Sequence, residues 1–271
     1  MSAGRCLASA REQGDVAPDD PRLHLAERVA RLSADQALTL SLMVDAMETP
    51  VISTIAPTTD FATQPFVDSM ADALRIHHVV SAESFTKDKS EHALVAALTR
   101  AGHVAELAPR GNPGYDLTVD DARWSLKTEA SANIRRDSLH ISKFMELGRG
   151  AWVTEADLAG LRQRMFDHMT SYDRILSLRC ISARRGSPAH EREYELVEIP
   201  KALVLESANY PCLMQHDSTQ TPKPGRCVVP DPATGRPKFE LYFDGGTERK
   251  LQVRSIEKTL CTVRATWKFR T

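Results

Sequence analysis

The sequence predicts an α/β fold with a central mixed β-sheet, helices on its faces and a β-rich C-terminal part. Residues 22–101 show mainly helical periodicity, whereas residues 171–271 alternate apolar and polar side chains as strands do. Between them, residues 114–129 form two short alternating runs around an Asp-Asp pair, which is typical of a β-hairpin. A hydrophobic content of 42% in 271 residues allows a sizeable core.

The composition predicts one domain that carries a tail. Residues 1–21 are polar and contain two prolines, so we expect a mobile N-terminal tail. Residues 22–271 would form a single domain with a helical part (22–101), a core (102–170) and a β-rich part (171–271). The net charge of −1 indicates no polyanionic partner, but the β-rich part holds 17 Lys or Arg against 12 Asp or Glu and is the better candidate for contact with an anion.

The helical part is predicted from its caps. Ser33 and Gln36 resemble a capping box, which predicts a helix to about Met47. Residues 49–64 are rich in Thr and Pro and are expected to be a connection, followed by a helix at 65–74.

A stronger helix is predicted at 87–101, because four apolar residues form a stripe and Gly102 is placed to end it. A strand at 104–107 leads through a Pro- and Gly-rich turn into the hairpin at 114–129. The stripe consists of Ala93, Leu94, Ala97 and Leu98.

Two helices and five strands are predicted after the hairpin. Residues 141–147 are expected to form a short helix, and Thr154 with Asp157 is an N-cap signature for a helix through about Met169. Asp244-Gly245-Gly246 is a predicted hairpin turn. The strands are expected at 175–182, 194–199, 239–243, 251–256 and 259–269.

One face of the predicted hairpin concentrates charge. Asp116 lies on the first run, and Ser125, Lys127 and Glu129 share one face of the second. Burying such groups is costly unless they pair or bind a metal ion. Metal-assisted cleavage of a phosphodiester needs carboxylates that hold Mg²⁺ and a positive group near the attacking water. Asp116 and Lys127 supply two of these parts, and Glu91 or Glu129 could supply another carboxylate.

Pro113-Gly-Tyr-Asp116 followed by Ser125-Leu-Lys127 resembles the motif of the PD-(D/E)xK nucleases. From about residue 65 to the C-terminus, several further segments resemble, in the same order, the SmaI family of type II restriction endonucleases. These segments are Asn112-Pro-Gly-Tyr-Asp116, Leu126-Lys-Thr-Glu-Ala130, His140-Ile-Ser-Lys-Phe-Met-Glu-Leu-Gly148, Leu196-Val-Glu-Ile-Pro-Lys201, Pro222-Lys-Pro-Gly225 and Leu241-Tyr-Phe-Asp-Gly-Gly-Thr-Glu-Arg-Lys-Leu-Gln252.

The resemblance implies a type II restriction endonuclease with a PD-(D/E)xK core that cuts double-stranded DNA as a homodimer and requires Mg²⁺. It implies the GC-rich palindrome CCCGGG as the target and a DNA methyltransferase, which protects the host, as functional partner. Asp116 would bind the metal and Lys127 would position or activate the water. The cut position does not follow, because enzymes that read this palindrome cut either bluntly or with an overhang.

One position departs from the motif. Ser125 stands where the superfamily usually has Asp or Glu, so one expected carboxylate ligand must come from elsewhere. Glu129 shares a face with Lys127, and Glu91 comes from the preceding helix. Glu146 is a third candidate, ranked below these two, if the segment after the hairpin packs back on it.

Six residues are candidates for contact with DNA, and for each of them the alternative is an ordinary solvated side chain. Arginine donates two hydrogen bonds to guanine O6 and N7, and a two-stranded ribbon fits the major groove. Arg249 and Lys250, which follow the Asp-Gly-Gly turn, are therefore candidates for contact with bases or with the DNA backbone. The other four candidates would contact a phosphate or belong to an ordinary surface loop. The others are His140, Lys143, Arg135 and Arg136.

Two alternatives remain open at this point. Because of Ser125, the chain could be a sequence-specific DNA-binding protein with a degenerate nuclease core, or it could be a structure-specific nuclease of repair or recombination. Five widely spaced cysteines without a C-x-x-C pair indicate neither a disulfide framework nor a zinc site. With no apolar segment near Met1, we expect a cytoplasmic protein.

Overall fold

The computed structural model of the chain describes Arg22 and residues 24–271, so the predicted tail at 1–21 lies outside the described residues. The chain separates into two compact units, Met1–Val44 and Asp45–Thr271. Helix α1 (Leu25–Val29) lies in the first unit, and α2 (Ala34–Glu48) begins there. The predicted capping box of α2 is confirmed: the Ser33 N–H donates to Gln36 Oε1 (3.0 Å), and the Gln36 N–H donates to Ser33 Oγ (3.3 Å).

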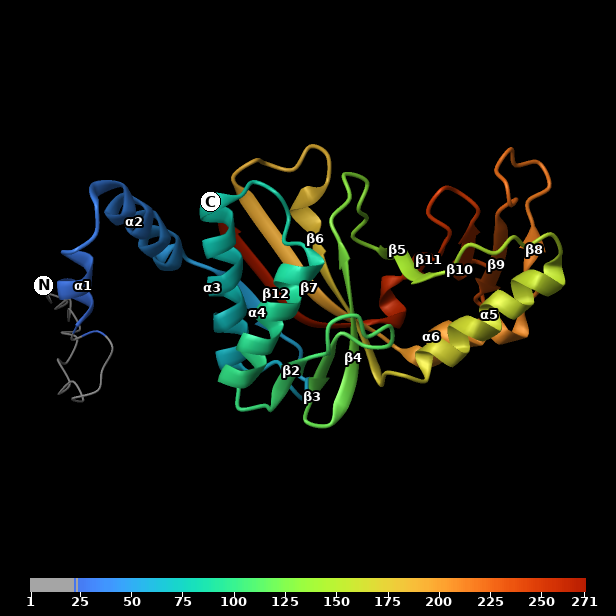
Figure 1. Ribbon diagram of the computed structural model, residues 1–271, viewed down its shortest axis with the longest axis horizontal. Coiled ribbons are helices and arrows are strands. Elements are labelled where there is room, and N and C mark those ends of the chain that lie inside the picture. The colour runs from blue at the N-terminus through green and yellow to red at the C-terminus, as the bar shows by residue number, and fades with distance from the viewer. Residues whose placement is uncertain (1–21, 23) are drawn as a thin grey trace, which may run out of the picture. The chain divides into compact units, whose positions relative to one another are not determined.

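The second unit contains a seven-stranded sheet in the order β1-β12-β7-β6-β4-β3-β2 (Figure 1). Only β4 and β6 are paired in parallel, so the sheet is mixed, as the sequence predicted. Its strands are β1 (Ile52–Ile55), β2 (Ala105–Leu107), β3 (Leu117–Val119), β4 (Ala122–Glu129), β6 (Arg174–Cys180), β7 (Glu191–Ile199) and β12 (Thr262–Arg270).

A second sheet of five antiparallel strands, in the order β5-β11-β10-β9-β8, accounts for the predicted β-rich character of the C-terminal part. The predicted turn at 244–246 joins β10 and β11, in which Asp244 is paired with Lys250. Its strands are β5 (Ser138–Glu146), β8 (Leu213–Met214), β9 (Gly225–Pro230), β10 (Pro237–Asp244) and β11 (Lys250–Glu257).

The helices of this unit serve two separate cores. Buried residues of α3 and α4 pack against one face of the seven-stranded sheet, whereas α5 packs with the five-stranded sheet and the opposite face of β6 and β7. Alternation along β6 directs Leu176 into the first core and Ile175 into the second. The helices are α3 (Gln64–Val80), α4 (Lys87–Arg100), α5 (Glu155–Met169) and α6 (Lys201–Leu205), with 3₁₀ turns at Ile181–Ala183, Glu206–Asn209 and Lys258–Leu260.

Local signals place three elements where the sequence predicted them. Gly102 has φ +96° just after α4, and Thr154 and Asp157 form the predicted capping box of α5. Asp120 and Asp121 have φ values of 45° and 70°, the backbone that a two-residue hairpin turn requires.

Two predictions were wrong. Residues 141–147, expected to be a short helix, belong to strand β5 and its end. A register irregularity between β5 and β11 places the buried residues Ile141 and Phe144 three positions apart, which imitates helical spacing. The expected connection at 49–64 contains β1, a half-exposed edge strand paired with β12.

The four cysteines in the described part, Cys180, Cys212, Cys227 and Cys261, are free thiols. Within Arg22 and residues 24–271, none of the helices combines the length and the apolar content needed to cross a membrane.

Candidate active site

Asp116 is held rigidly at the start of the hairpin. The register pairs Leu117 with Trp124, which places Asp116 beside Ser125 on the neighbouring strand. The Asp116 N–H donates to the carbonyl of Trp124 (2.8 Å), and Oδ2 accepts from the Leu126 N–H (2.6 Å). Because backbone groups of the neighbouring strand bind both the main-chain N–H and the carboxylate of Asp116, the carboxylate has a defined orientation.

Ser125 connects Asp116 to Lys127. Its hydroxyl, which is buried, lies 3.4 Å from Asp116 Oδ2 and accepts a hydrogen bond of 3.0 Å from Lys127 Nζ. Burial lowers the pKa of Lys127 to about 8, with Asp116 opposing this shift. The serine at the position of the expected carboxylate therefore positions the lysine instead of carrying charge.

A second carboxylate reaches the same place from helix α4. Lys87 Nζ lies 2.7 Å from Asp116 Oδ1 and 3.4 Å from Glu91 Oε1, so one ammonium is shared by two carboxylates. Burial opposes the charge of Lys87, but the contacts with Asp116 and Glu91 outweigh it and raise its pKa. Burial raises the pKa of Glu91, with Lys87 acting in the opposite direction.

A cavity of about 680 Å³ between the hairpin, β5 and the end of α5 is lined by Lys87, Asp116 and Lys127. Phe144 on β5 covers Lys127, with Nζ 5.8 Å from the ring centre. His168 at the end of α5 also lines the cavity, and burial followed by the charge of Lys127 lowers its pKa. The cavity thus brings carboxylates, ammonium groups and an imidazole together.

Glu129 shares a face of β4 with Lys127, as predicted, but it belongs to a different cluster. Its carboxylate is buried and accepts from Arg179 Nε at 2.5 Å. The same guanidinium also pairs with Glu195 and donates to the backbone carbonyls of Arg135 (2.6 Å) and Ser138 (2.7 Å).

Glu146 lies at the exposed end of β5, where it lines the cavity and pairs with Lys143 (2.7 Å). Lys143 also pairs with Glu248 (2.7 Å). It lies on strand β5, whereas the sequence predicted a short helix in this segment. Neither residue has a hydrogen bond to Asp116 among the described contacts.

The other predicted DNA contacts are dispersed. His140 and Arg135 line a separate cavity with Glu129, and Arg136 forms a bidentate pair with Glu193 at 2.5 and 2.6 Å. Arg249 and Lys250 follow the β10–β11 turn, as expected. Arg249 Nη1 donates to the carbonyls of Arg149 and Gly150 (2.6 Å for Gly150), and Lys250 pairs with Glu248 at 2.9 Å.

The sequence interpretation missed Lys87 and His168. Lys87 stands four residues before Glu91, a spacing that places both on one helical face and could have indicated it. No comparable local signal identifies His168, because α5 approaches the hairpin only through tertiary packing.

Comparisons with known proteins agree with the resemblance seen in the sequence. A family model described as SmaI, type II site-specific deoxyribonuclease, matches residues 25–269. The type II restriction enzyme SmaI of Serratia marcescens is 40% identical over 211 residues, which cover 78% of this chain and 82% of that enzyme. No solved structure matches the chain.

Proposed function

We propose a reaction and a target for this chain, which belongs to the SmaI family of type II site-specific deoxyribonucleases. It is accordingly a type II restriction endonuclease, a DNA-binding hydrolase. The proposed target is the double-stranded palindrome CCCGGG, and the proposed catalytic part is a PD-(D/E)xK core around β3 and β4. The observation that carries the proposal is the chain of contacts from Asp116 through Ser125 to Lys127 in one cavity.

The carboxylate oxygens of Asp116 and Glu91 are suitable ligands for Mg²⁺. Asp116 and Glu91 direct carboxylate oxygens at the same ammonium, so a cation already lies between them. Among the described residues no group of three or more Asp, Glu, His or Cys could hold a metal, yet Mg²⁺ is commonly bound through one or two carboxylates, with water and substrate phosphates as further ligands. Asp116 and Glu91 would hold the ion, which lowers the pKa of water and polarises the phosphoryl oxygen.

Lys127 would act on the attacking water and on the charge that develops at the phosphate. Its ammonium is oriented by Ser125 and shielded by Phe144, so no solvent rearrangement is needed during the reaction. The water oxygen loses a proton and bonds to phosphorus, the bond from phosphorus to the 3′ oxygen breaks, and this oxygen takes up a proton from solvent. The products are a 5′-phosphate and a 3′-hydroxyl.

Glu91 is preferred over Glu129 as the second carboxylate because Glu129 is already paired with the buried Arg179. Removing Glu129 from Arg179 to bind a metal would leave a buried guanidinium with one carboxylate fewer. In the described part of the chain the ion-pair partner of Glu91 is Lys87, whose side chain is 42% exposed, whereas Arg179 is fully buried. The six DNA contacts predicted from the sequence remain candidates for phosphate or base contact.

A palindromic target suits a homodimer, because each subunit reads one half-site across a two-fold axis. The proposed functional partner is a DNA methyltransferase of the same specificity, since unprotected host DNA would be cut. The proposed location is the cytoplasm, where both enzymes meet the DNA.

Digestion of plasmid DNA with Mg²⁺, followed by sequencing of the ends, tests the proposal. We expect discrete fragments whose ends lie within CCCGGG, and the same experiment gives the cut position. Specific binding without cleavage would instead support a degenerate nuclease core, and nicking at branched junctions would support a repair nuclease. Family membership favours the restriction enzyme over both alternatives.

A further inference from the structure

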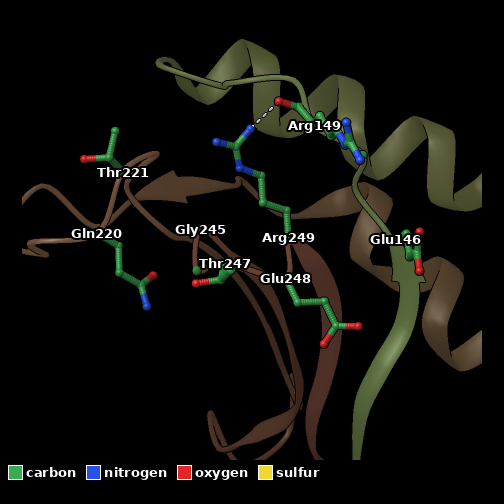
Figure 2. A pocket seen from close by; sticks show the side chains of 10 residues that line it. Glu146, Arg149, Gln220, Thr221, Gly245, Thr247, Glu248 and Arg249 are labelled. Carbon is green, nitrogen blue, oxygen red and sulfur yellow. Dashed lines mark hydrogen bonds between the residues drawn. The ribbon is translucent and has the colours of Figure 1, made fainter.

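A second cavity, of about 760 Å³, adjoins the candidate active site. Glu146 at the end of β5 lines both cavities, so the two are neighbours along this strand. Figure 2 shows Glu146 and Arg149 on one side of the second cavity and Gln220 and Thr221 on the other, with the β10–β11 turn between them. The two cavities therefore meet at the end of β5.

The walls of this cavity are tightly built. A Cβ atom on Gly245 would lie 1.8 Å from the carbonyl oxygen of Pro222, so the β10–β11 turn touches the segment that carries Gln220 and Thr221. Asp244 braces the turn, since its carboxylate accepts from the Gly246 N–H (3.0 Å) and from Gln252 Nε2 (2.9 Å). The cavity is a preformed hollow.

Arg249 braces the opposite wall. Its Nη1 donates to the carbonyls of Arg149 and Gly150 (2.6 Å for the latter), which ties β11 to the loop after β5 (Figure 2). In the part of the chain that the structure describes, the guanidinium of Arg149 itself forms no hydrogen bond or ion pair. The predicted base reader thus uses its Nη1 on the backbone, whereas the whole guanidinium of its neighbour Arg149 is available.

The cavity offers hydrogen-bond acceptors as well as donors. Glu248 pairs with Lys143 and Lys250, and these contacts lower its pKa to about 2, so its carboxylate is ionised and only accepts. Gln220 adds an amide that both donates and accepts. Two carboxylates, those of Glu146 and Glu248, would repel a phosphate, whereas a base pair presents donors and acceptors together.

We propose that this cavity reads the edge of a G·C base pair next to the cut phosphate, with Arg149 as the residue that determines specificity. The Arg149 guanidinium donates to guanine O6 and N7, and a carboxylate of the wall accepts from cytosine N4. This inference rests on the proposed GC-rich target. It gives Arg249 the further role of positioning Arg149.

The test measures binding of Arg149→Ala and Arg149→Lys to synthetic duplexes without Mg²⁺, after the ends of digested plasmid have defined the wild-type site. The duplexes carry the site or a single base-pair change at each position. We expect Arg149→Ala to bind the site roughly ten- to a hundredfold more weakly and to lose discrimination at one base pair of each half-site. Arg149→Lys keeps the charge but not the two-pronged donor, so it should lose the same discrimination.

The matched control is Arg236→Ala, an exposed arginine in the turn between β9 and β10. It should bind every duplex as the wild type does. Equal weakening on all duplexes, with full rescue by Arg149→Lys, would show a phosphate contact and overturn the proposal, as would unchanged discrimination. A wild-type protein that cuts at no GC-rich site would instead refute the proposed target, so the two failures are distinguishable.

Discussion

Two charged clusters lie on the same face of β4, only two residues apart, and they differ in how completely their charges are paired. Glu129 belongs to a buried cluster in which Arg179 is fully enclosed and donates to two carboxylates and two backbone carbonyls. Lys127 belongs to the candidate active site, where its ammonium has a single hydrogen-bond partner among the described residues, the Ser125 hydroxyl.

The difference separates a structural role from a chemical one. Buried charges whose hydrogen-bond capacity is used up inside the protein have nothing left to offer a substrate. Lys127 retains donors, and it faces a cavity that can admit a phosphodiester. Residue type does not distinguish Glu129 from Glu91, whereas the pairing of their carboxylates does.

The largest effect is expected from Lys127→Ala. The variant removes the positive group that is proposed to act on the attacking water, so cleavage should fall by about 10²- to 10⁴-fold. Binding to a duplex carrying the site should persist, because the groups that reach DNA remain. The measurement compares cleavage rate and duplex affinity, with the exposed Lys89→Ala on α4 as control. Cleavage at the wild-type rate would remove Lys127 from the site.

Arg179→Met should be the most destabilising substitution in the compared clusters. It leaves Glu129 and Glu195 buried without their shared guanidinium, which costs about 3–5 kcal/mol of unfolding free energy. The matched control is Arg136→Met, whose pair with Glu193 is exposed on the arginine side (58%) and is worth less than about 1 kcal/mol. Denaturant unfolding gives both values, and an equal loss in the two variants would contradict the assignment of the buried cluster.

A pair of isosteric variants tests the comparison directly. Glu91→Gln should lower cleavage by about a hundredfold at fixed Mg²⁺, because it weakens a proposed metal ligand, and leave unfolding nearly unchanged. Glu129→Gln should do the reverse, because it weakens the pairing of Arg179. Thermal unfolding and cleavage are measured on both proteins. If the effects are exchanged, Glu129 is the ligand and the fully paired cluster is part of the site.

Local sequence signals predicted the hairpin that carries Asp116 and Lys127 on neighbouring strands, because period-two alternation and a two-residue turn are local properties. They also predicted α4, its cap and the caps of α2 and α5. The prediction for the residues of β5 was wrong because the irregular pairing of this strand gives its buried residues a helical spacing. The partner of Glu129 could not be predicted, since Arg179 lies 50 residues away and meets it only through the parallel pairing of β4 and β6.

His78 extends the comparison to a buried group that has no acidic partner within the described residues. Burial, together with Arg192 and His77 nearby, lowers its pKa to about 4. Above the unfolded value near pH 6.5 both states are neutral, and below it only the unfolded state takes up the proton. Unfolding free energy should therefore fall by about 2 kcal/mol between pH 6.5 and 4.

His78→Gln should reduce this pH dependence, while the exposed His190→Gln should retain it. Denaturant unfolding at a series of pH values measures both slopes. An unchanged slope in His78→Gln would mean that other groups control the acid response.

Lys87→Ala should have the smallest effect. It tests how strongly the Lys87 ammonium competes with a metal ion for the carboxylates of the candidate active site. The wild-type ammonium must leave the carboxylates of Asp116 and Glu91 before a divalent cation can bind them. Because Lys87 is 42% exposed, solvent screens much of this competition, and we expect only a two- to fivefold gain in metal affinity, about 0.5–1 kcal/mol. Calorimetric titration with Ca²⁺ or Mg²⁺ measures the gain, with Lys89→Ala unchanged. Weaker metal binding in Lys87→Ala would mean that the ammonium preorganises the two carboxylates instead of competing with the metal.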